Sequence, residues 1–273
     1  NHPLKGWLNA YLFMKNKIFR LFILFSLSLQ AQVTVESGLN QMIVAKAGET
    51  AIVPINLSNQ SNALQRVKFD LVDYTNDCEE GYIYFNENEV LDFSLRPWIQ
   101  LENEELYLLP NEKRSFLVKV AVPEESALST AHTSLFVRNA PVLDSSAVTG
   151  VVKFAVQIQY AVNLIYSNPD YAENVHLEAT ELQKDTSDLG SLSITIKNTS
   201  KQSTNYSADL EILSAEGITL FKGSRSMAPI QGEQCRTLNF EKLALPHGSH
   251  GLFLILQTES GQIFSISDQI IWP

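Results

Sequence analysis

The chain has 273 residues, a formal net charge of −10 and a pI near 5.0. An acidic surface repels the phosphate backbone of nucleic acids and anionic lipid head groups, so neither is an expected partner. The length suits two domains of ordinary size, each able to bury a core without metal ions or several disulfides.

The N-terminal region has the pattern of an export signal. Lys15, Lys17 and Arg20 precede an apolar run over residues 21–29, and Ala31 lies in a small-residue cleavage site. We therefore expect residues 14–32 to be a signal peptide and residues 1–13 to be an upstream extension. An uncleaved anchor is the alternative, although the apolar run is short for a transmembrane helix. Export predicts a periplasmic location, with the cell surface or secretion as alternatives, and no stable membrane insertion.

Short apolar runs with the two-residue period of half-buried strands dominate the chain after residue 33. In the first half, the expected strands cover residues 41–45, 50–57, 67–74, 114–122, 131–139 and 151–166. In the second half, they cover residues 190–197, 206–213, 219–225, 235–240, 250–257 and 262–271. Regularly spaced strands without intervening helices predict an all-β fold, with two immunoglobulin-like β-sandwich domains in tandem after the signal peptide.

A polar segment with a proline, residues 167–170, interrupts the strand pattern near the middle of the chain. We place a domain boundary there. The first immunoglobulin-like domain then covers residues 33–167, and a second immunoglobulin-like or fibronectin-like domain covers residues 168–273.

The two cysteines, Cys78 and Cys235, fall in different expected domains. In an oxidising compartment a disulfide between them would clamp the domains together. The sequence places Cys78 in a loop and gives neither cysteine a CxxC neighbour, so we expect two separate, partly buried thiols, and the disulfide stays open as the alternative.

The histidines, cysteines and carboxylates of the sequence do not have the spacing of a known catalytic or metal-binding motif. His247 and His250 flank a glycine in a segment typical of a turn, and no third metal ligand is near them. Two acidic clusters lie in expected loops without the spacing of a calcium loop; they are Asp77, Glu79 and Glu80, and Glu102, Glu104 and Glu105. Nucleophile elbows, metalloprotease motifs and phosphate-binding glycine loops are missing from the sequence. We expect no enzyme activity, catalytic residue, cofactor or metal.

The last strand of the first domain is unusually long. Apolar residues alternate with polar ones from Val152 to Tyr166, which at about 3.3 Å per residue gives a strand on the order of 50 Å. Part of such a strand is expected to project along a sheet edge, where unpaired backbone groups can add a strand of another protein. The alternative is a long core strand that leads into the linker.

Several segments in order resemble the periplasmic pilus-assembly chaperones, the PapD-like family. Phe93-Ser94-Leu95-Arg96-Pro97 is similar to a family strand, and Leu109-Pro110-Asn111-Glu112 is similar to the turn before its valine-rich strand. Residues 134–141 are similar to a further family segment. The alternating run from Phe154 to Tyr166 is similar to the family's donor strand and its exit into the second domain.

The resemblance implies that the donor strand fills the groove of a pilin subunit that lacks its own last strand. The implied partner-binding residues are Val152, Phe154, Val156, Ile158 and Asn163. Asn163 stands where the family has a lysine that, with an arginine of the first strand, anchors the carboxylate of the subunit. The first strand here, residues 41–44, contains no arginine, so the resemblance indicates a divergent member.

The sequence thus predicts a periplasmic chaperone-like protein that binds a fimbrial or other surface β-subunit by edge-strand pairing. A structural or adhesive envelope protein with the same tandem sandwiches and no chaperone activity is the alternative. The difference between them is whether the long strand is covered on both edges.

Overall fold

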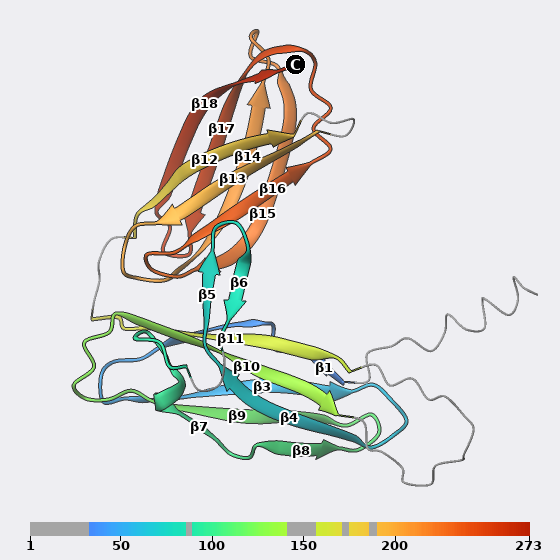
Figure 1. The fold of residues 1–273 in the computed structure, drawn as a ribbon, viewed down its shortest axis with the longest axis vertical. Helices are drawn as coiled ribbons and strands as arrows, with labels where there is room; N and C mark the ends of the chain where they lie inside the picture. The colour runs from blue at the N-terminus through green and yellow to red at the C-terminus, as the bar shows by residue number, and fades with distance from the viewer. Residues whose placement is uncertain (1–32, 86–88, 141–156, 171–174, 186–189) are drawn as a thin grey trace, which may run out of the picture.

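The structure, a computed structural model, describes residues 33–85, 89–140, 157–170, 175–185 and 190–273. The chain forms two β-sandwiches joined near residue 168 (Figure 1), which confirms the predicted fold class. The segments expected to be an upstream extension and a signal peptide lie outside the described residues. Within the described residues, no helix is long and apolar enough to cross a membrane.

The first sandwich consists of a four-stranded and a five-stranded sheet. The four-stranded sheet has the order β1 (Val33–Val35), β3 (Thr50–Asn59), β9 (Lys113–Ala121) and β7 (Ile99–Leu101). The five-stranded sheet has the order β2 (Asn40–Val44), β11 (Gln159–Ser167), β10 (Thr130–Ala140), β4 (Gln65–Val72) and β8 (Glu105–Leu108). A hairpin of β5 (Tyr74–Asp77) and β6 (Gly81–Tyr84) leaves this sandwich, and one 3₁₀ turn, η2 (Arg96–Trp98), precedes β7.

The core of the first sandwich follows from the alternation in its strands. On β9, Phe116 and Val118 are buried, whereas Leu117 between them faces outward. The rings of Phe116 and Phe69 on β4 stack with centroids 3.8 Å apart, which joins the two sheets. Each fully buried side chain of this size contributes about 1.5–3 kcal/mol, so the apolar face of these strands fixes which side turns inward.

The second sandwich also has two sheets. The three-stranded sheet has the order β12 (Leu177–Asp185), β13 (Ser191–Asn198) and β16 (Cys235–Glu241). The four-stranded sheet has the order β15 (Thr219–Ile230), β14 (Thr204–Leu213), β17 (Gly248–Thr258) and β18 (Ile263–Trp272).

The last hairpin contains a turn that only a few residue types can make. Gly261 has a φ of +84°, and Thr258 N donates to Gln262 O at 2.9 Å. Glycine adopts this left-handed conformation without steric cost, which explains the hairpin that joins β17 to β18.

The strand pattern missed several elements. The apolar alternation predicted no strand at β12, and it predicted neither β5 nor β6 on the two sides of the loop expected at residues 77–80. Residues 248–249, expected to belong to a turn before the strand at residues 250–257, are already part of β17. The glycine in this segment misled the interpretation, because a paired strand tolerates glycine where its neighbours supply the packing.

The N-terminal segment of the first domain changes sheets. β1 pairs with β3 in one sheet, and β2, five residues later in the chain, pairs in parallel with β11 in the other. Gly38, with a φ of +84°, lies at the crossing. Because β1 belongs to the opposite sheet, β2 is the one described strand that pairs with the outer edge of β11, and it does so at residues 163–167.

We predict that Leu254→Ala lowers the free energy of unfolding by about 2–5 kcal/mol, because it opens a cavity in the core of the second sandwich. Leu254 is 0% exposed, whereas its neighbour Ile255 faces outward and is 46% exposed. Ile255→Ala is therefore the matched control and should cost about 1 kcal/mol or less. Denaturant unfolding followed by circular dichroism measures both, and equal losses would contradict the assignment of faces.

Candidate partner-binding edge and the joint between the sandwiches

The outer edge of β11 is half covered. β10 pairs with β11 along its whole length, from Gln159 to Ser167. On the other side, β2 pairs only with residues 163–167. Among the described residues, no strand pairs with the outer edge of residues 159–162. β11 is therefore paired on both edges at residues 163–167, and on one edge by a described strand at residues 159–162.

Two hydrogen bonds show which backbone groups face the open edge. Asn139 N donates to Ile158 O at 3.1 Å, so even-numbered residues of β11 exchange hydrogen bonds with β10. Asn163 N donates to Leu39 O at 2.7 Å, away from β10. By the same alternation, the N–H and C=O groups of Gln159 and Ala161 point to the open side. They are the groups to which another strand would bond.

The side chains of β11 follow the same alternation. Val162 and Leu164 lie in the core of the first sandwich, and Tyr160 packs against that core. Ile158 has the same parity and is half-buried. Val152, Phe154 and Val156 lie outside the described residues, so their predicted role in partner binding stays a prediction.

Asn163 is committed to contacts within the domain. It is buried, its Oδ1 accepts from Ser134 Oγ at 2.6 Å, and its Nδ2 donates to Asn40 Oδ1 at 3.0 Å. These bonds tie together the three neighbouring strands β10, β11 and β2. Its predicted contact with a partner is not tested by this geometry, but the amide already has a partner on each side.

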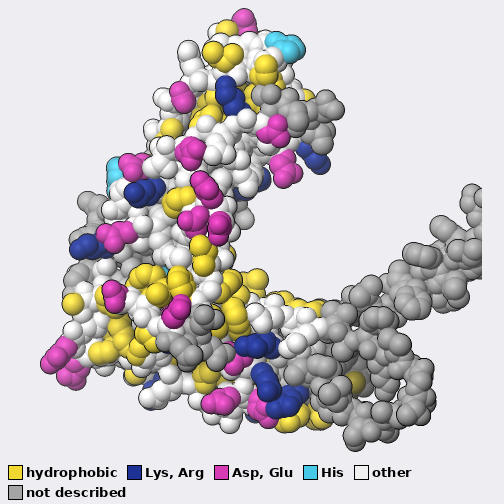
Figure 2. All heavy atoms as spheres, in the orientation of Figure 1, with side chains coloured by type: hydrophobic (Ala, Val, Ile, Leu, Met, Phe, Trp, Pro, Cys, Tyr) yellow, Lys and Arg dark blue, Asp and Glu magenta, His cyan; other side chains and the backbone are white. Residues whose placement is uncertain are grey.

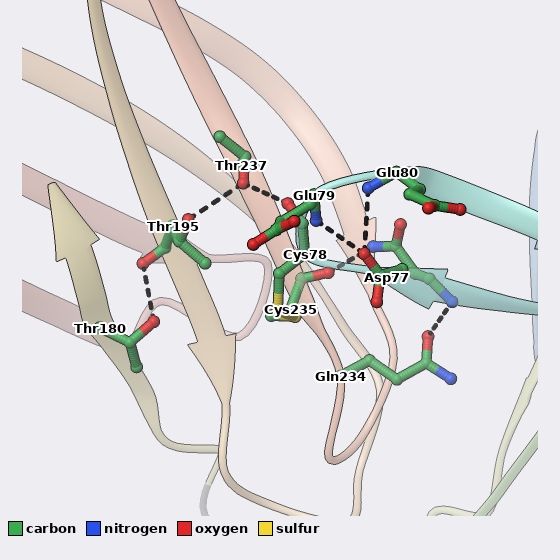
Figure 3. Close-up of a disulfide and its surroundings, with 10 residues drawn as sticks. Asp77, Cys78, Glu79, Glu80, Thr180, Thr195, Gln234, Cys235 and Thr237 are labelled. Atoms are coloured by element: carbon green, nitrogen blue, oxygen red, sulfur yellow. Dashed lines mark hydrogen bonds between the residues drawn. A yellow bond between two sulfur atoms is a disulfide. The ribbon is translucent and has the colours of Figure 1, made fainter. Parts of the chain in front are cut away.

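The β5–β6 hairpin reaches from the first sandwich to the second and carries a disulfide in its turn (Figure 3). Cys78 in that turn is bonded to Cys235, the first residue of β16, with Cα atoms 5.2 Å apart. The expectation of two separate thiols was therefore wrong. The reason is that residues after Tyr74 form a hairpin, not a loop, and this hairpin brings Cys78 to the other domain. Two cysteines in an exported chain were the signal that favoured the pairing.

Hydrogen bonds surround the disulfide and hold the same joint. Asn76, which is buried, donates from its backbone N to Gln234 Oε1 at 3.1 Å and from Nδ2 to Cys235 O at 2.5 Å. Thr237 Oγ1 donates to Cys78 O at 2.6 Å (Figure 3). At the base of the hairpin, Gln231 Nε2 donates to the Tyr74 hydroxyl at 2.9 Å.

A second set of contacts lies near the linker. The hydroxyls of Thr130 and Ser203 are 2.7 Å apart, and Gln202 Nε2 donates to Ser167 Oγ at 3.2 Å. The two sandwiches are thus joined at two places, at the β5–β6 hairpin and at the end of β11. Figure 2 shows hydrophobic side chains gathered on one face where the sandwiches meet.

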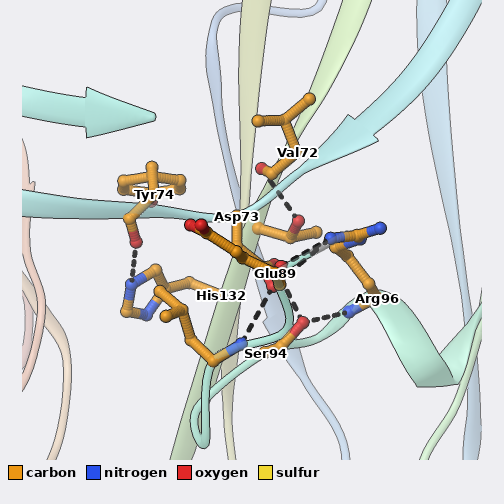
Figure 4. A network of polar contacts seen from close by, with 9 residues as sticks. Val72, Asp73, Tyr74, Glu89, Ser94, Arg96 and His132 are labelled. Carbon is orange, nitrogen blue, oxygen red and sulfur yellow. Dashed lines mark hydrogen bonds and ion pairs between the residues drawn. The ribbon is translucent and has the colours of Figure 1, made fainter. Parts of the chain in front are cut away.

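A buried polar network holds the start of the hairpin (Figure 4). Asp73 lies between β4 and β5 and is fully buried. Its carboxylate accepts from Ser94 Oγ at 2.8 Å and from Leu91 N at 3.3 Å, and Arg96 Nη1 lies 3.8 Å from it. A buried carboxylate needs such donors to offset its desolvation. The network therefore ties the segment before β7 to the root of the hairpin.

His132 on β10 lies beside this network. Its Nε2 is 3.0 Å from Tyr74 O, its ring stacks on Phe93, and it is buried. Burial lowers the pKa of His132 to about 4, against a smaller opposing effect of the bond to Tyr74. The ring is therefore neutral at pH 7, with Nε2 as the donor to the carbonyl. The contact with Tyr74 O at the start of β5 supports the position of the hairpin.

The acidic and histidine clusters singled out in the sequence have structural contacts. Asp77 Oδ1 accepts from the backbone N of Glu79 and Glu80 in the hairpin turn, and these bonds lower the pKa of Asp77 (Figure 3). Glu105 forms an ion pair with Arg66. His250 Nε2 is 2.7 Å from Pro246 O. In the described part of the chain, no three His, Cys, Asp or Glu side chains are grouped as a metal site.

No family model matches the chain, and no curated protein matches it. The structure of the Salmonella enterica SafA pilin in complex with the SafB chaperone is similar, with a TM-score of 0.46, 12% identity and coverage of 89% of this chain and 98% of that chain. The YadV chaperone has a TM-score of 0.46 and 12% identity over 88% of this chain and 100% of its own. The Pseudomonas aeruginosa CupB2 chaperone has a TM-score of 0.45 and 9% identity over 87% and 100%.

These neighbours are chaperones, the class that the sequence resemblance indicated.

We predict that the purified, unfolded protein contains no free thiol until it is reduced, as measured with a thiol reagent. The double variant Cys78→Ser/Cys235→Ser should lose about 2–4 kcal/mol of stability, because the closed loop no longer restricts the unfolded chain. Two free thiols in the unreduced, exported protein would contradict the pairing.

We predict that His132 contributes to acid sensitivity. Between pH 6.5 and about 4 the unfolded chain binds a proton at this position that the folded chain does not, so stability falls as the pH falls, by up to about 3 kcal/mol. His132→Gln should lose less stability than the wild type between pH 7 and pH 4.5 in denaturant titrations. His176→Gln, at an exposed position, is the control for the change of residue type.

Proposed function

We propose that this chain is an exported, chaperone-like protein that binds a β-rich fimbrial or other surface subunit by adding a strand of that subunit to the open edge of β11. The observation that carries the proposal is the uncovered edge of residues 159–162. There β10 occupies one side, and no described strand occupies the other. The backbone groups of Gln159 and Ala161 can pair with a subunit strand that lacks a partner of its own.

The surroundings of this edge favour specific binding of a partner over nonspecific aggregation. A long uncovered strand is a liability that proteins usually avoid. Here β2 covers residues 163–167, and the Tyr160 hydroxyl bonds to Val33 O at 3.1 Å, which closes the seam between the sheets. Among the described residues only a short stretch of this edge stays open, next to the covered residues 163–167, and the sequence before it contains the alternating apolar residues Val156 and Phe154.

The disulfide and hairpin support the same role through preorganisation. A partner that binds between two freely moving domains has to order them, which costs binding free energy. Here the joint fixes the second sandwich relative to β11 before any partner arrives. The sequence resemblance to pilus-assembly chaperones supplies the class of partner, and the predicted signal peptide supplies the compartment, the periplasm.

A structural or adhesive envelope module is the second candidate, and the covered half of β11 favours it. Residues 163–167 have strand partners on both sides, as a purely structural strand would. In that case the edge at residues 159–162 would contact no client, and the disulfide would serve mechanical stability only.

We predict that a photo-crosslinking residue at Gln159, in the exported protein in cells, forms an adduct with a β-rich surface subunit. The same residue at Lys119, exposed on the outer face of β9, should not. Ala161→Pro should abolish the adduct, because it removes an N–H that faces the open edge while the hydrogen bonds to β10 remain. Unfolding curves would verify that the variant is folded.

The matched control is Ser265→Pro, on the free edge of β18 in the second sandwich. Thr258 N bonds to Gln262 O, so by alternation the N–H of Ser265 also faces away from its partner strand. This variant should keep the adduct. Adducts of equal yield from Gln159 and Lys119, or an Ala161→Pro variant that is folded and still captures the subunit, would reject strand addition at β11.

A further inference from the structure

The last strand, β18, is an open edge of the second sandwich (Figure 1). β17 pairs with it from Ile263 to Trp272 without a register shift, and no described strand pairs with its other side. The other three edges of this sandwich are protected, because β12 and β15 contain bulges and the β5–β6 hairpin is bonded to β16. Bulges and covering segments protect sheet edges against further pairing. Among the described strands of the second sandwich, β18 is thus the one edge that is regular and uncovered.

The alternation of hydrogen bonds shows which backbone groups of β18 are open. Thr258 N donates to Gln262 O, so the even-numbered residues of β18 exchange hydrogen bonds with β17. The N–H and C=O groups of the odd-numbered residues, from Ile263 to Ile271, therefore point to the open edge. The side chains of the same residues are exposed on the outer face of the sheet.

Large apolar side chains lie at both ends of this edge. Ile263 is 66% exposed and Ile271 is 68% exposed. Phe253 and Ile255 on β17 are exposed on the same outer face. Apolar side chains that gather in this way beside open backbone groups indicate an interaction surface.

The residues along this edge form a pattern that fits a second copy of itself. Their order is Ile263, Ser265, Ser267, Gln269 and Ile271. Antiparallel pairing about a two-fold axis at Ser267 places Ile263 of each copy opposite Ile271 of the other, and Ser265 opposite Gln269. All of these residues have open backbone groups, so each pair can exchange hydrogen bonds. The isoleucines that are exposed in one copy then contact each other across the interface.

Charge does not oppose this register. Asp268, the one charged residue of β18, lies opposite Ile266 of the other copy. Its Oδ1 accepts from Gln269 N at 2.7 Å, a bond between exposed neighbours that a carbonyl of the second copy can replace. Lys184 Nζ donates to Ile271 O at 2.9 Å, and a carbonyl oxygen has a second lone pair for another donor. Both contacts are therefore compatible with pairing.

We propose that the exported chain forms a two-fold symmetric dimer in which β18 of one copy pairs antiparallel with β18 of a second copy. The four-stranded sheets of the two copies then form one continuous sheet. Because each copy uses its one regular open edge of this sandwich, the assembly closes at two copies and does not grow into a fibre. The dimer does not involve β11, so this inference is independent of the proposed function.

The association is measured on the full exported protein, with its disulfide intact, by sedimentation equilibrium from about 1 μM to about 500 μM. We expect an equilibrium between monomer and dimer. A photo-crosslinking residue at Ser267, on the two-fold axis, should form a covalent dimer. The same residue at Lys119, exposed on β9, should not.

Two variants test the backbone and the side chains of the interface separately. Ser265→Pro removes an N–H that points to the open edge, and should weaken dimerisation at least about ten-fold. Ile263→Ser removes the apolar contact at both ends of the interface and should also weaken it about ten-fold. Ile52→Ser, at a position on β3 that is 63% exposed, is the matched control and should leave dimerisation unchanged. Near-UV circular dichroism verifies the fold of each variant.

Ala161→Pro distinguishes the open edge of β18 from that of β11, and it should leave the dimer intact. A monomer at every concentration, a dimer that survives both Ser265→Pro and Ile263→Ser, or a dimer that is lost in Ala161→Pro would overturn the inference. A dimer that depends on β18, in a protein whose Gln159 position crosslinks to no subunit, would keep this inference and reject the proposed function. The two proposals therefore fail on different measurements.

Discussion

The arrangement of the whole molecule depends on one joint, the β5–β6 hairpin with its disulfide. Two sandwiches connected by a single linker would otherwise be expected to move relative to each other. Cys78 bonded to Cys235, with Asn76 and Thr237 hydrogen-bonded around it, adds a second connection far from the linker in the sequence. A body attached at two separate places has far less freedom of rotation. The open edge of β11 therefore has a fixed position relative to the second sandwich.

The root of that hairpin explains why polar residues are buried inside the first domain. Asp73 and His132 would cost free energy in an apolar core, and each is offset by hydrogen bonds to the backbone or to side chains around the hairpin. These contacts position β5 as it leaves β4. The same residues thus connect the packing of the first sandwich to the placement of the second, while the sheet change of the N-terminal segment leaves part of β11 uncovered.

Part of the candidate site could be predicted from the sequence, and part could not. The alternation through Val162, Leu164 and Tyr166 predicted a strand whose apolar face is inward, and these residues are in the core. The pattern could not show where β2 would stop covering that strand, because coverage depends on a partner more than a hundred positions away. Asn163 was singled out by resemblance, and its contacts to Ser134 and Asn40 became visible only in three dimensions.

By itself the sequence determined the fold class, because a two-residue apolar period without helical stretches is a local property that each strand carries in its own residues. It also set the acidic charge and the export pattern, which are matters of composition. The pairing of Cys78 with Cys235 and the half-covered edge of β11 became visible in three dimensions alone. Each of these depends on the distance between residues far apart in the chain, and strand periodicity contains no information about that distance.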